Sequence, residues 1–191
     1  MLNSSDVQVL LVDLQDRAFR RRLTNPEPAI RASARALARF SKIYKFPVVQ
    51  TLVPGGEEGQ PRSIGEIAEE VGADAFVRSS PHSLAYLPLR DALNRNGRRA
   101  LGVGGLVSEI GLLNAVLGAL DAGYQVHVLV DLAGGLTERT EQAAFRQMER
   151  AGAVLSSVPT FAYAMIDDFT TAAFAEAISE LRKCGPMAAA R

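Results

Sequence analysis

The sequence is poor in three residue types that often build stabilising or catalytic centres: it has one cysteine, no tryptophan and two histidines among 191 residues. The single cysteine, Cys184, cannot form a disulfide within the chain, and the chain opens on a strand-like run instead of a secretion signal. The longest apolar runs, such as residues 126–130, are far shorter than the roughly 20 residues that cross a bilayer. We therefore expect a cytoplasmic protein without a membrane span.

Neither sign of charge predominates, because 21 Lys and Arg residues balance 21 Asp and Glu residues. The resulting weak overall field gives no reason to expect nucleic acid or an anionic membrane as a partner. A length of 191 residues suits one compact domain with a substantial core. We expect a single domain over residues 1–191 whose partner is a small molecule or another copy of the chain.

The sequence does contain a regular alternation of short β-branched runs with longer segments of helical periodicity. This pattern is typical of βα units around a parallel sheet. The residues from Val7 to Val12 are apolar except for Gln8, which favours a central strand buried on both faces. We predict an α/β fold of three αβα layers, with helices on both faces of a mostly parallel six-stranded sheet. The expected strands cover residues 7–12, 47–52, 75–78, 100–104, 125–130 and 154–157.

Local signals set the expected helix ends. Asn25 and Pro26 predict an N-cap followed by the first residue of a helix that runs to about Lys45. Ser63 and Glu66 have the spacing of a capping box. The other helices are expected at residues 87–96, 108–122, 137–152, 160–168 and 171–183, before a small-residue tail at 185–191.

The carboxyl ends of the predicted strands carry the candidate chemistry, because ligands of open parallel sheets bind there. The residues at these ends are Asp13, Arg78 and the turn at residues 104–108, with Asp131 as a weaker candidate. Taken singly, each has an ordinary structural interpretation: an aspartate at a strand end often caps a turn, and a lone arginine is usually a surface residue.

The two glycines of that turn do not form a dinucleotide-binding fingerprint. Ser108 and Glu109 stand where the later glycines of that fingerprint are needed. The sequence therefore predicts no dinucleotide cofactor, and we expect no cofactor of another kind.

Together, these positions resemble the isochorismatase-like (cysteine hydrolase) superfamily. The resemblance covers nearly the whole chain, and the stretch QAAFRQMERAGA at residues 142–153 is most similar to the YcaC-like branch. It implies an isochorismatase-like hydrolase fold. The segments that carry it are LLVDLQ at residues 10–15, Arg78 ahead of Ser83, GLVSEIGL at 105–112 and DAGYQVHVLVD at 121–131.

In most of this superfamily the reaction centre is an aspartate, a lysine and a nucleophilic cysteine at the start of the helix after the fourth strand. The resemblance places Asp13 at the aspartate, Arg78 at or beside the lysine, and Gly111 at the cysteine. Glycine cannot attack a carbonyl, so the usual thioester chemistry is excluded. Cys184 lies far from the motif in sequence and is not expected to replace the nucleophile.

Isochorismatases proper are similar to this sequence at Gly111, since they have glycine there and form no covalent intermediate. In their reaction the aspartate protonates the vinyl ether carbon, the oxocarbenium ion takes up water, and the hemiketal releases pyruvate. Arg78 departs from the family lysine: its permanent cation favours the anion of Asp13 and suits holding a substrate carboxylate.

The resemblance also implies a cis peptide bond between Leu106 and Val107, with the amides of Val107 and Gly111 forming an oxyanion hole. Ser108 and Glu109 are candidates to line the same pocket, although a serine at that position is also typical of a helix cap.

The nicotinamidases of this superfamily bind a metal through an aspartate and several histidines after the second strand. Here that stretch reads TLVPGG at residues 51–56, and the only histidines are His82 and His127. We expect no bound metal. His82, near Arg78 in sequence, is the better candidate for a substrate contact, although a lone loop histidine is usually only solvated.

Two functions remain open. The first is a cysteine-independent hydrolase of a small carboxylated substrate, with a vinyl ether as one candidate. The second is a catalytically silent relative that serves as a binding or assembly module. Under either hypothesis we expect a homo-oligomer, with the apolar segment at residues 171–181 as a candidate interface.

Overall fold

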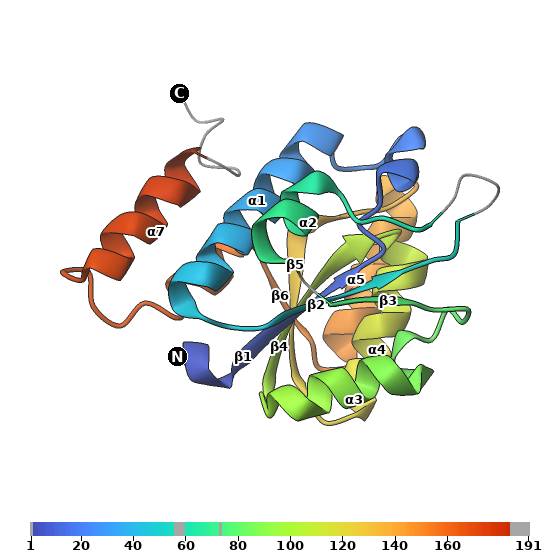
Figure 1. Cartoon of the computed structure of the whole chain (residues 1–191). Coiled ribbons are helices and arrows are strands. Elements are labelled where there is room, and N and C mark those ends of the chain that lie inside the picture. Colours follow the sequence, from blue (N-terminus) through green and yellow to red (C-terminus); the bar gives the residue numbers. More distant parts are fainter. Residues whose placement is uncertain (1, 56–59, 73, 184–191) are drawn as a thin grey trace.

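The structure is a computed structural model that describes residues 2–55, 60–72 and 74–183 (Figure 1). The strands are β1 (Val7–Val12), β2 (Val48–Leu52), β3 (Asp74–Val77), β4 (Ala100–Leu106), β5 (Gln125–Gly134) and β6 (Val154–Ser156). The α-helices are α1 (Glu27–Tyr44), α2 (Gly65–Val71), α3 (Leu87–Asn96), α4 (Leu113–Asp121), α5 (Glu138–Arg150), α6 (Val158–Tyr163) and α7 (Ala172–Lys183). Short helical turns are η1 (Ser4–Asp6), η2 (Asp16–Arg20), η3 (Ser83–Ala85) and η4 (Ser108–Leu112).

The strands form one parallel sheet in the order β3-β2-β1-β4-β5-β6. The predicted six-stranded sheet is confirmed, and β1 lies at its centre beside β4. The strand order reverses between these two strands, which makes their carboxyl ends the topological switch point where open α/β sheets bind ligands.

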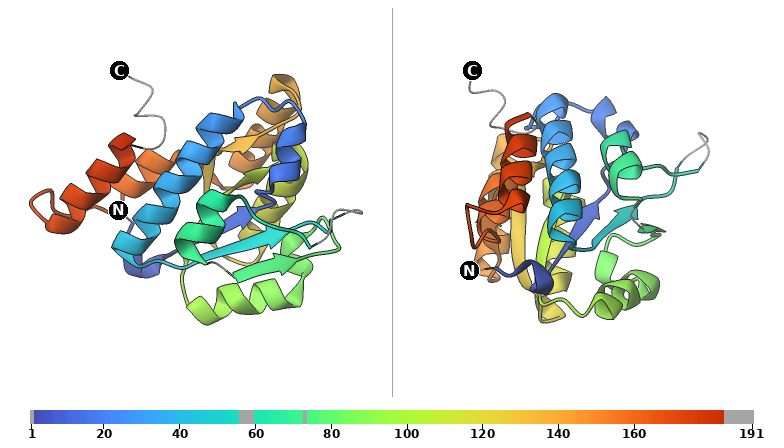
Figure 2. Two further views of the ribbon diagram at one scale, coloured as in Figure 1. Left: turned by 45° about the horizontal axis from the view of Figure 1, so that its top comes forward. Right: turned by 60° about the vertical axis from the view of Figure 1, so that its left-hand side comes forward.

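Helices cover both faces of the sheet, as Figure 1 and the two views in Figure 2 show. One face packs against α1, α2, α6 and α7, and the other packs against α3, α4 and α5. Alternate residues of β1 enter the two cores: Val9 and Leu11 face the first, whereas Leu10 and Val12 face the second. This double burial explains why β1 is almost continuously apolar.

Gln8 is the exception in β1, and its buried amide is fully engaged. It donates to the carbonyl oxygens of Leu93 and Arg98 at 3.3 Å each and accepts from Asn96 at 2.9 Å. These bonds offset the cost of burying a polar side chain and anchor β1 to the end of α3.

Two strands are longer than predicted. β4 runs to Leu106, so Gly104 and Gly105 belong to the strand and not to a turn. Gly105 lets β4 lie close to β1, since a Cβ at this position would lie 2.1 Å from the carbonyl oxygen of Val12. β5 continues to Gly134 after a register shift against β4, which places Asp131 inside the strand and not at its end.

Two predicted helix caps are wrong because each capping side chain bonds instead to backbone carbonyls from another part of the chain. α1 begins at Glu27 with Pro26 as its N-cap. The side-chain amide of Asn25 donates instead to the Val130 and Ala133 carbonyls. α2 begins at Gly65 without a side-chain cap. Ser63 donates instead to the Leu14 carbonyl at 3.4 Å.

The C-terminal helices also differ from expectation. α6 begins at Val158, capped by Ser157, which the sequence pattern had assigned to the sixth strand. α7 packs along α1 and buries Ala177 and Leu181 there, so part of its apolar face is used within the chain (Figures 1 and 2). In the described ranges, no helix combines the length and apolarity needed to span a bilayer.

Candidate active site

A cavity of about 690 Å³ opens at the switch point between β1 and β4. This volume suits a small-molecule ligand. Asp13, Arg78 and Gly111, which come from three separate parts of the sequence, all line it. The other lining residues are Gln15, Arg17, Ala18, Arg20, Arg21, Val53, Pro54, Ser79, Ser80, Pro81, Leu106, Val107 and Ile110.

Asp13 is the first residue after β1, and its backbone turns there. Its φ of 56° lies in the left-handed region, and its amide donates to the Thr51 carbonyl at 2.9 Å, which prolongs the pairing with β2. The side chain is only 10% exposed. Its Oδ1 accepts a hydrogen bond from Thr51 Oγ1 at 3.2 Å, and its Oδ2 pairs with Nη2 of Arg78.

Arg78 directly follows β3 and is almost completely buried, with 4% of its side chain exposed. Besides its ion pair with Asp13, it donates through Nη1 to the Ser80 carbonyl. Its buried Nε has no hydrogen-bond partner among the residues the structure describes. A buried guanidinium N–H without an acceptor is costly, so this atom is a ready donor for a ligand.

Burial and the neighbouring polar groups shift the pKa of Asp13 in opposite directions. Burial is the largest influence and raises the pKa of the carboxyl from 3.8 to about 6, while Arg78, Thr51 and Arg17 lower it. The net result is a carboxyl group that exchanges its proton close to neutral pH. Such a group can serve as an acid or a base in catalysis.

Gly111 lies in η4, the π-helical turn that leads from β4 into α4. A Cβ built on Gly111 would lie 2.8 Å from the Leu106 carbonyl oxygen and 3.0 Å from Oδ2 of Asp13. The position therefore has no room for a side chain unless its neighbours move. The peptide bond between Leu106 and Val107 is cis, as the resemblance implied.

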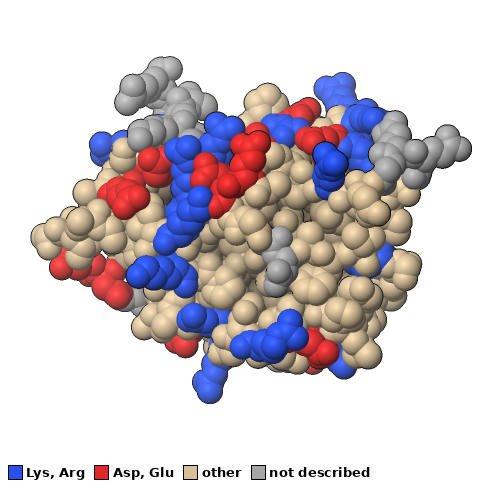
Figure 3. Space-filling model, in the orientation of Figure 1, with Lys and Arg blue, Asp and Glu red and all other residues tan. Residues whose placement is uncertain are grey.

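Three arginines of this cavity were missed at the sequence level: Arg17, Arg20 and Arg21 come from η2 and the residue after it. The signal was present, because four arginines fall within residues 17–22 immediately after the first strand. The balanced total charge concealed this local excess. Figure 3 shows basic side chains gathered at the end of the molecule where Figure 1 draws the segment after β1.

The η2 segment is held in place from the cavity side. Gln15 forms two hydrogen bonds with the backbone of Val53, donating to its carbonyl at 3.2 Å and accepting from its amide at 3.0 Å. Arg17 donates to the same carbonyl at 2.9 Å. These bonds join the two loops that follow β1 and β2.

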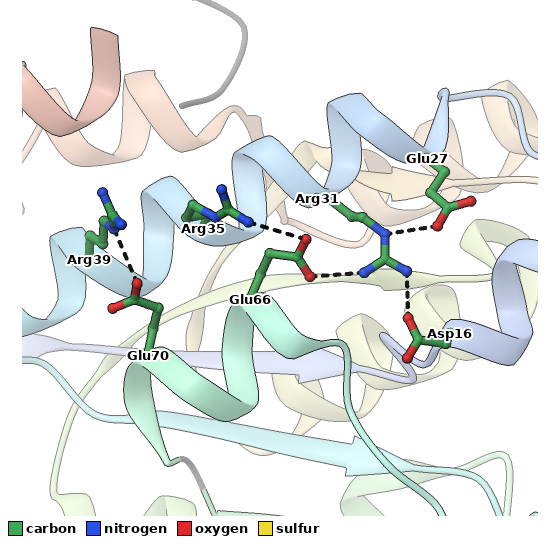
Figure 4. A network of polar contacts seen from close by, with 7 residues as sticks. All are labelled: Asp16, Glu27, Arg31, Arg35, Arg39, Glu66 and Glu70. Carbon is green, nitrogen blue, oxygen red and sulfur yellow. Dashed lines mark hydrogen bonds and ion pairs between the residues drawn. The ribbon is translucent and has the colours of Figure 1, made fainter. Parts of the chain in front are cut away.

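Arg31 of α1 holds the same segment from the outer side (Figure 4). It pairs with Asp16 at 2.5 Å, with Glu27 at 2.8 Å and with Glu66 of α2 at 2.9 Å. Its guanidinium also lies 5.0 Å from the ring centroid of Phe19. η2 is therefore fixed to α1, α2 and the loop after β2.

Ser108 and Glu109 lie beside the cavity-lining residues without lining the cavity themselves. Ser108 is fully buried and donates to Glu141 at 2.7 Å. Glu109 accepts from the Leu136 amide at 3.0 Å and from the Thr140 hydroxyl at 2.6 Å. Glu109 therefore holds the loop between β5 and α5, whereas Ser108 joins η4 to α5 itself.

The remaining sequence candidates lie elsewhere. His82 is exposed at the start of η3 and does not line the cavity. Asp131 accepts hydrogen bonds from Ser33 of α1 at 3.2 Å and from the Val158 amide of α6 at 2.8 Å, so it joins two helices. Cys184 lies outside the described residues.

Comparison with known proteins agrees with this geometry. The family model described as isochorismatase domain matches residues 7–160. Isochorismatase domain-containing protein 2 of Rattus norvegicus is 27% identical over 170 residues, which cover 88% of this chain and 77% of that protein.

Two solved structures share the fold. The MAR1 ribonuclease of Caenorhabditis elegans has a TM-score of 0.84 at 21% identity and covers 94% of this chain and 91% of its own. The YcaC gene product of Escherichia coli, described as an octameric hydrolase of unknown specificity, has a TM-score of 0.83 at 24% identity, with 95% and 93% covered. With a family model matching from β1 into α6 and these structural neighbours, the chain belongs to the isochorismatase family, a family of hydrolases.

Proposed function

We propose that this protein is a hydrolase that acts without a cysteine nucleophile on a small carboxylated substrate, with vinyl ether hydrolysis as the favoured reaction. Asp13 is the acid–base group and Arg78 binds the substrate carboxylate. The cavity is large enough for such a substrate and is lined by both groups.

The close packing of Gly111 against Asp13 is the observation that carries this proposal. The family resemblance places the usual nucleophile at position 111, and a Cβ there would lie 3.0 Å from the Asp13 carboxylate. A nucleophilic side chain and the Asp13–Arg78 pair therefore exclude each other in this arrangement. Chemistry that needs only a proton and a water molecule remains open to the site.

Arg78 has two roles in this mechanism. Before the substrate binds, its cation favours the carboxylate form of Asp13 and partly offsets the effect of burial on the pKa of that group. A substrate carboxylate that accepts hydrogen bonds from the guanidinium replaces Asp13 as its anionic partner. Asp13 is then released to take up a proton, which it donates to the vinyl ether carbon before water adds to the resulting cation.

The cavity lining favours a small molecule over RNA. Its described residues include Val53, Leu106, Val107 and Ile110 as apolar contacts but no aromatic side chain on which a base could stack. Degradation of RNA by the pure protein, abolished by Asp13→Asn, would contradict the choice of substrate class.

The alternative is a catalytically silent binding protein. It is favoured by the direct ion pair between Asp13 and Arg78, because a permanently charged partner opposes protonation of the carboxyl. The two functions differ in one outcome: a silent protein binds carboxylates without converting them.

We also propose that the chain self-associates, as the octameric YcaC protein does. Large apolar side chains remain exposed beside the cavity and next to α7, including Ile110 at 51% and Phe169 at 65%. Sedimentation at micromolar concentration is expected to show an oligomer, and a monomer would contradict the proposal.

A ligand screen tests the proposed activity. Small carboxylates, carboxamides and vinyl ethers are first ranked by thermal shift, because a ligand that binds only the native state raises its stability. Each hit is then incubated with the protein and followed by mass spectrometry. We expect a carboxylated vinyl ether among the converted hits. Binding without any conversion would favour the silent protein.

A further inference from the structure

Thr51 packs against Asp13 from the neighbouring strand and contacts both its backbone and its side chain. It belongs to β2, pairs with Val12 of β1 and is completely buried. Its carbonyl accepts from the Asp13 amide at 2.9 Å, and its hydroxyl donates to Oδ1 of Asp13 at 3.2 Å. A β-branched side chain on a strand has few rotamers, so this contact fixes the direction in which the carboxyl group points.

The two oxygens of Asp13 have different surroundings. Oδ2 pairs with Arg78, and a Cβ built on Gly111 would lie 3.0 Å from it. Arg78 and Gly111 both line the cavity, whereas Thr51 does not. Oδ2 is therefore the oxygen on the cavity side, and Oδ1 is directed towards β2.

The hydroxyl of Thr51 has a single acceptor for its hydrogen atom. Within residues 2–55, 60–72 and 74–183, Oδ1 of Asp13 is its only hydrogen-bond partner. A buried hydroxyl that accepted a proton from Oδ1 would leave its own hydrogen without an acceptor, which is costly. The hydrogen bond therefore favours Oδ1 as the acceptor, and a proton taken up by the carboxyl group goes to Oδ2.

We propose that Thr51 is a positioning residue that holds Oδ1 of Asp13 as a hydrogen-bond acceptor and so keeps the exchangeable proton on Oδ2, which faces the substrate. This inference rests on the proposed function and deepens it, because it states which oxygen of Asp13 transfers the proton. Thr51 itself does not touch the substrate. When a substrate carboxylate takes Arg78 away from Asp13, Thr51 remains as the partner that keeps the carboxyl group in place.

Removal of the hydroxyl has two separate effects on Asp13. The carboxyl group loses its fixed orientation, so its proton can sit on the oxygen that faces away from the substrate. Burial raises the pKa of Asp13, and the hydrogen bond from Thr51 is among the influences that lower it. The cations of Arg78 and Arg17 also lower this pKa and remain in a Thr51 variant, so the loss of one hydrogen bond raises it further. Such a variant is slower in acid catalysis and yet stays protonated to a higher pH.

The test compares Thr51→Val, which keeps the shape of the side chain but lacks the hydroxyl, with Thr51→Ser, which keeps the hydroxyl. The titration of the Asp13 carboxyl carbon is followed by NMR in the full chain, with Asp13→Asn to assign the signal. We expect the pKa of Asp13 to rise by about half a pH unit or more in Thr51→Val and to return to the wild-type value in Thr51→Ser. With a verified substrate, Thr51→Val loses about tenfold in kcat while KM stays within about twofold, and Thr51→Ser restores kcat.

Ser33→Ala is the matched control. Ser33 of α1 also has a buried hydroxyl that donates to an aspartate at 3.2 Å, but its acceptor is Asp131, which does not line the cavity. Its loss should leave the titration of Asp13 and kcat unchanged. Thr51→Ala, which also lacks the hydroxyl, replaces Thr51→Val if that variant does not fold.

Two results would overturn the inference: a titration of Asp13 and a kcat that are the same in Thr51→Val as in wild type, or equal changes in Ser33→Ala. Failure here is separable from failure of the proposed function. Turnover that depends on Asp13 but not on Thr51 would retain the hydrolase and reject the positioning role. A pKa of Asp13 that rises in Thr51→Val and returns in Thr51→Ser, in a protein that converts no substrate, would support the control of the carboxyl group by Thr51 and reject the proposed reaction.

Discussion

Gly111 packs against the carboxylate of Asp13 so closely that a Cβ at position 111 would lie 3.0 Å from Oδ2 of Asp13 and 2.8 Å from the Leu106 carbonyl oxygen. Gly111→Ala must therefore displace the carboxylate or the backbone after β4. We expect a loss of about 1–3 kcal/mol in the free energy of unfolding, typical of overpacking. Urea denaturation measures this loss.

Gly65→Ala is the control for that change. A Cβ on Gly65 would lie 3.4 Å from the nearest atom, the flexible end of Glu69, and the residue is the first of α2. Alanine in a helix is favoured over glycine by about 1 kcal/mol, so this variant should be neutral or more stable. Equal stability of the Gly111 and Gly65 variants would show that a side chain fits at position 111 without displacing its neighbours.

The raised pKa of Asp13 makes its contribution to stability depend on pH. The carboxyl has a pKa of about 6 in the folded protein and an ordinary value of 3.8, so between these values the folded state binds a proton that the unfolded state lacks. Stability from this group is therefore greatest below pH 4 and is lost as the pH rises through 6. The loss is about 3 kcal/mol, from about 1.4 kcal/mol per pKa unit.

Comparison with Asp13→Asn isolates this contribution. The difference in unfolding free energy, wild type minus variant, should fall between pH 4 and pH 7 and then remain constant. A difference that rises with pH would show that the cation of Arg78 outweighs burial and holds the pKa of Asp13 below its ordinary value.

Arg31 supports the cavity from outside, since it joins η2 to α1 and α2. Arg31→Gln is expected to cost about 1 kcal/mol of stability, at the upper end for partly exposed ion pairs. It should also lower kcat/KM for a verified substrate, because the η2 residues that line the cavity lose their support.

Arg35→Gln provides the comparison for Arg31. Arg35 is 48% exposed and makes one 3.6 Å contact with Glu66, so its removal should change stability by less than about 0.5 kcal/mol. Its effect on kcat/KM should be negligible. Equal effects of the two variants on kcat/KM would mean that net charge alone, and not the support of η2, is responsible.

The fold was predictable because the apolar pattern records which surfaces are buried. β1 sends alternate side chains into two cores, so its near-continuous apolar run indicated a central strand. Predictions failed where a local signal competed with a distant partner. Asn25 has the chemistry of an N-cap, yet its amide bonds to β5 carbonyls more than 100 residues away.

The candidate site was predictable only in part. Strand ends and family resemblance pointed to Asp13, Arg78 and Gly111, and the fold brings all three to one cavity. Ser108 and Glu109 were inseparable from them by sequence, because whether a side chain faces a pocket or a neighbouring loop depends on the path of η4. The η2 arginines were missed because total charge says nothing about where charges gather.

If Asp13 is the general acid, the reaction rate must follow its protonation. With a pKa of about 6, the protonated fraction falls tenfold per pH unit above that value, and kcat/KM for a vinyl ether should fall with it. A rate that instead rises up to pH 6 and then levels off would assign Asp13 the role of base.

The most direct test of the account is the steady-state conversion of one verified substrate by wild type, Asp13→Asn and Cys184→Ala, followed by mass spectrometry. Cysteine-free acid catalysis predicts that the Asp13 variant loses at least about 100-fold in kcat, the lower range for a positioned acid, and that the Cys184 variant keeps full activity. Turnover that survives the Asp13 change, or that disappears with Cys184, would contradict it.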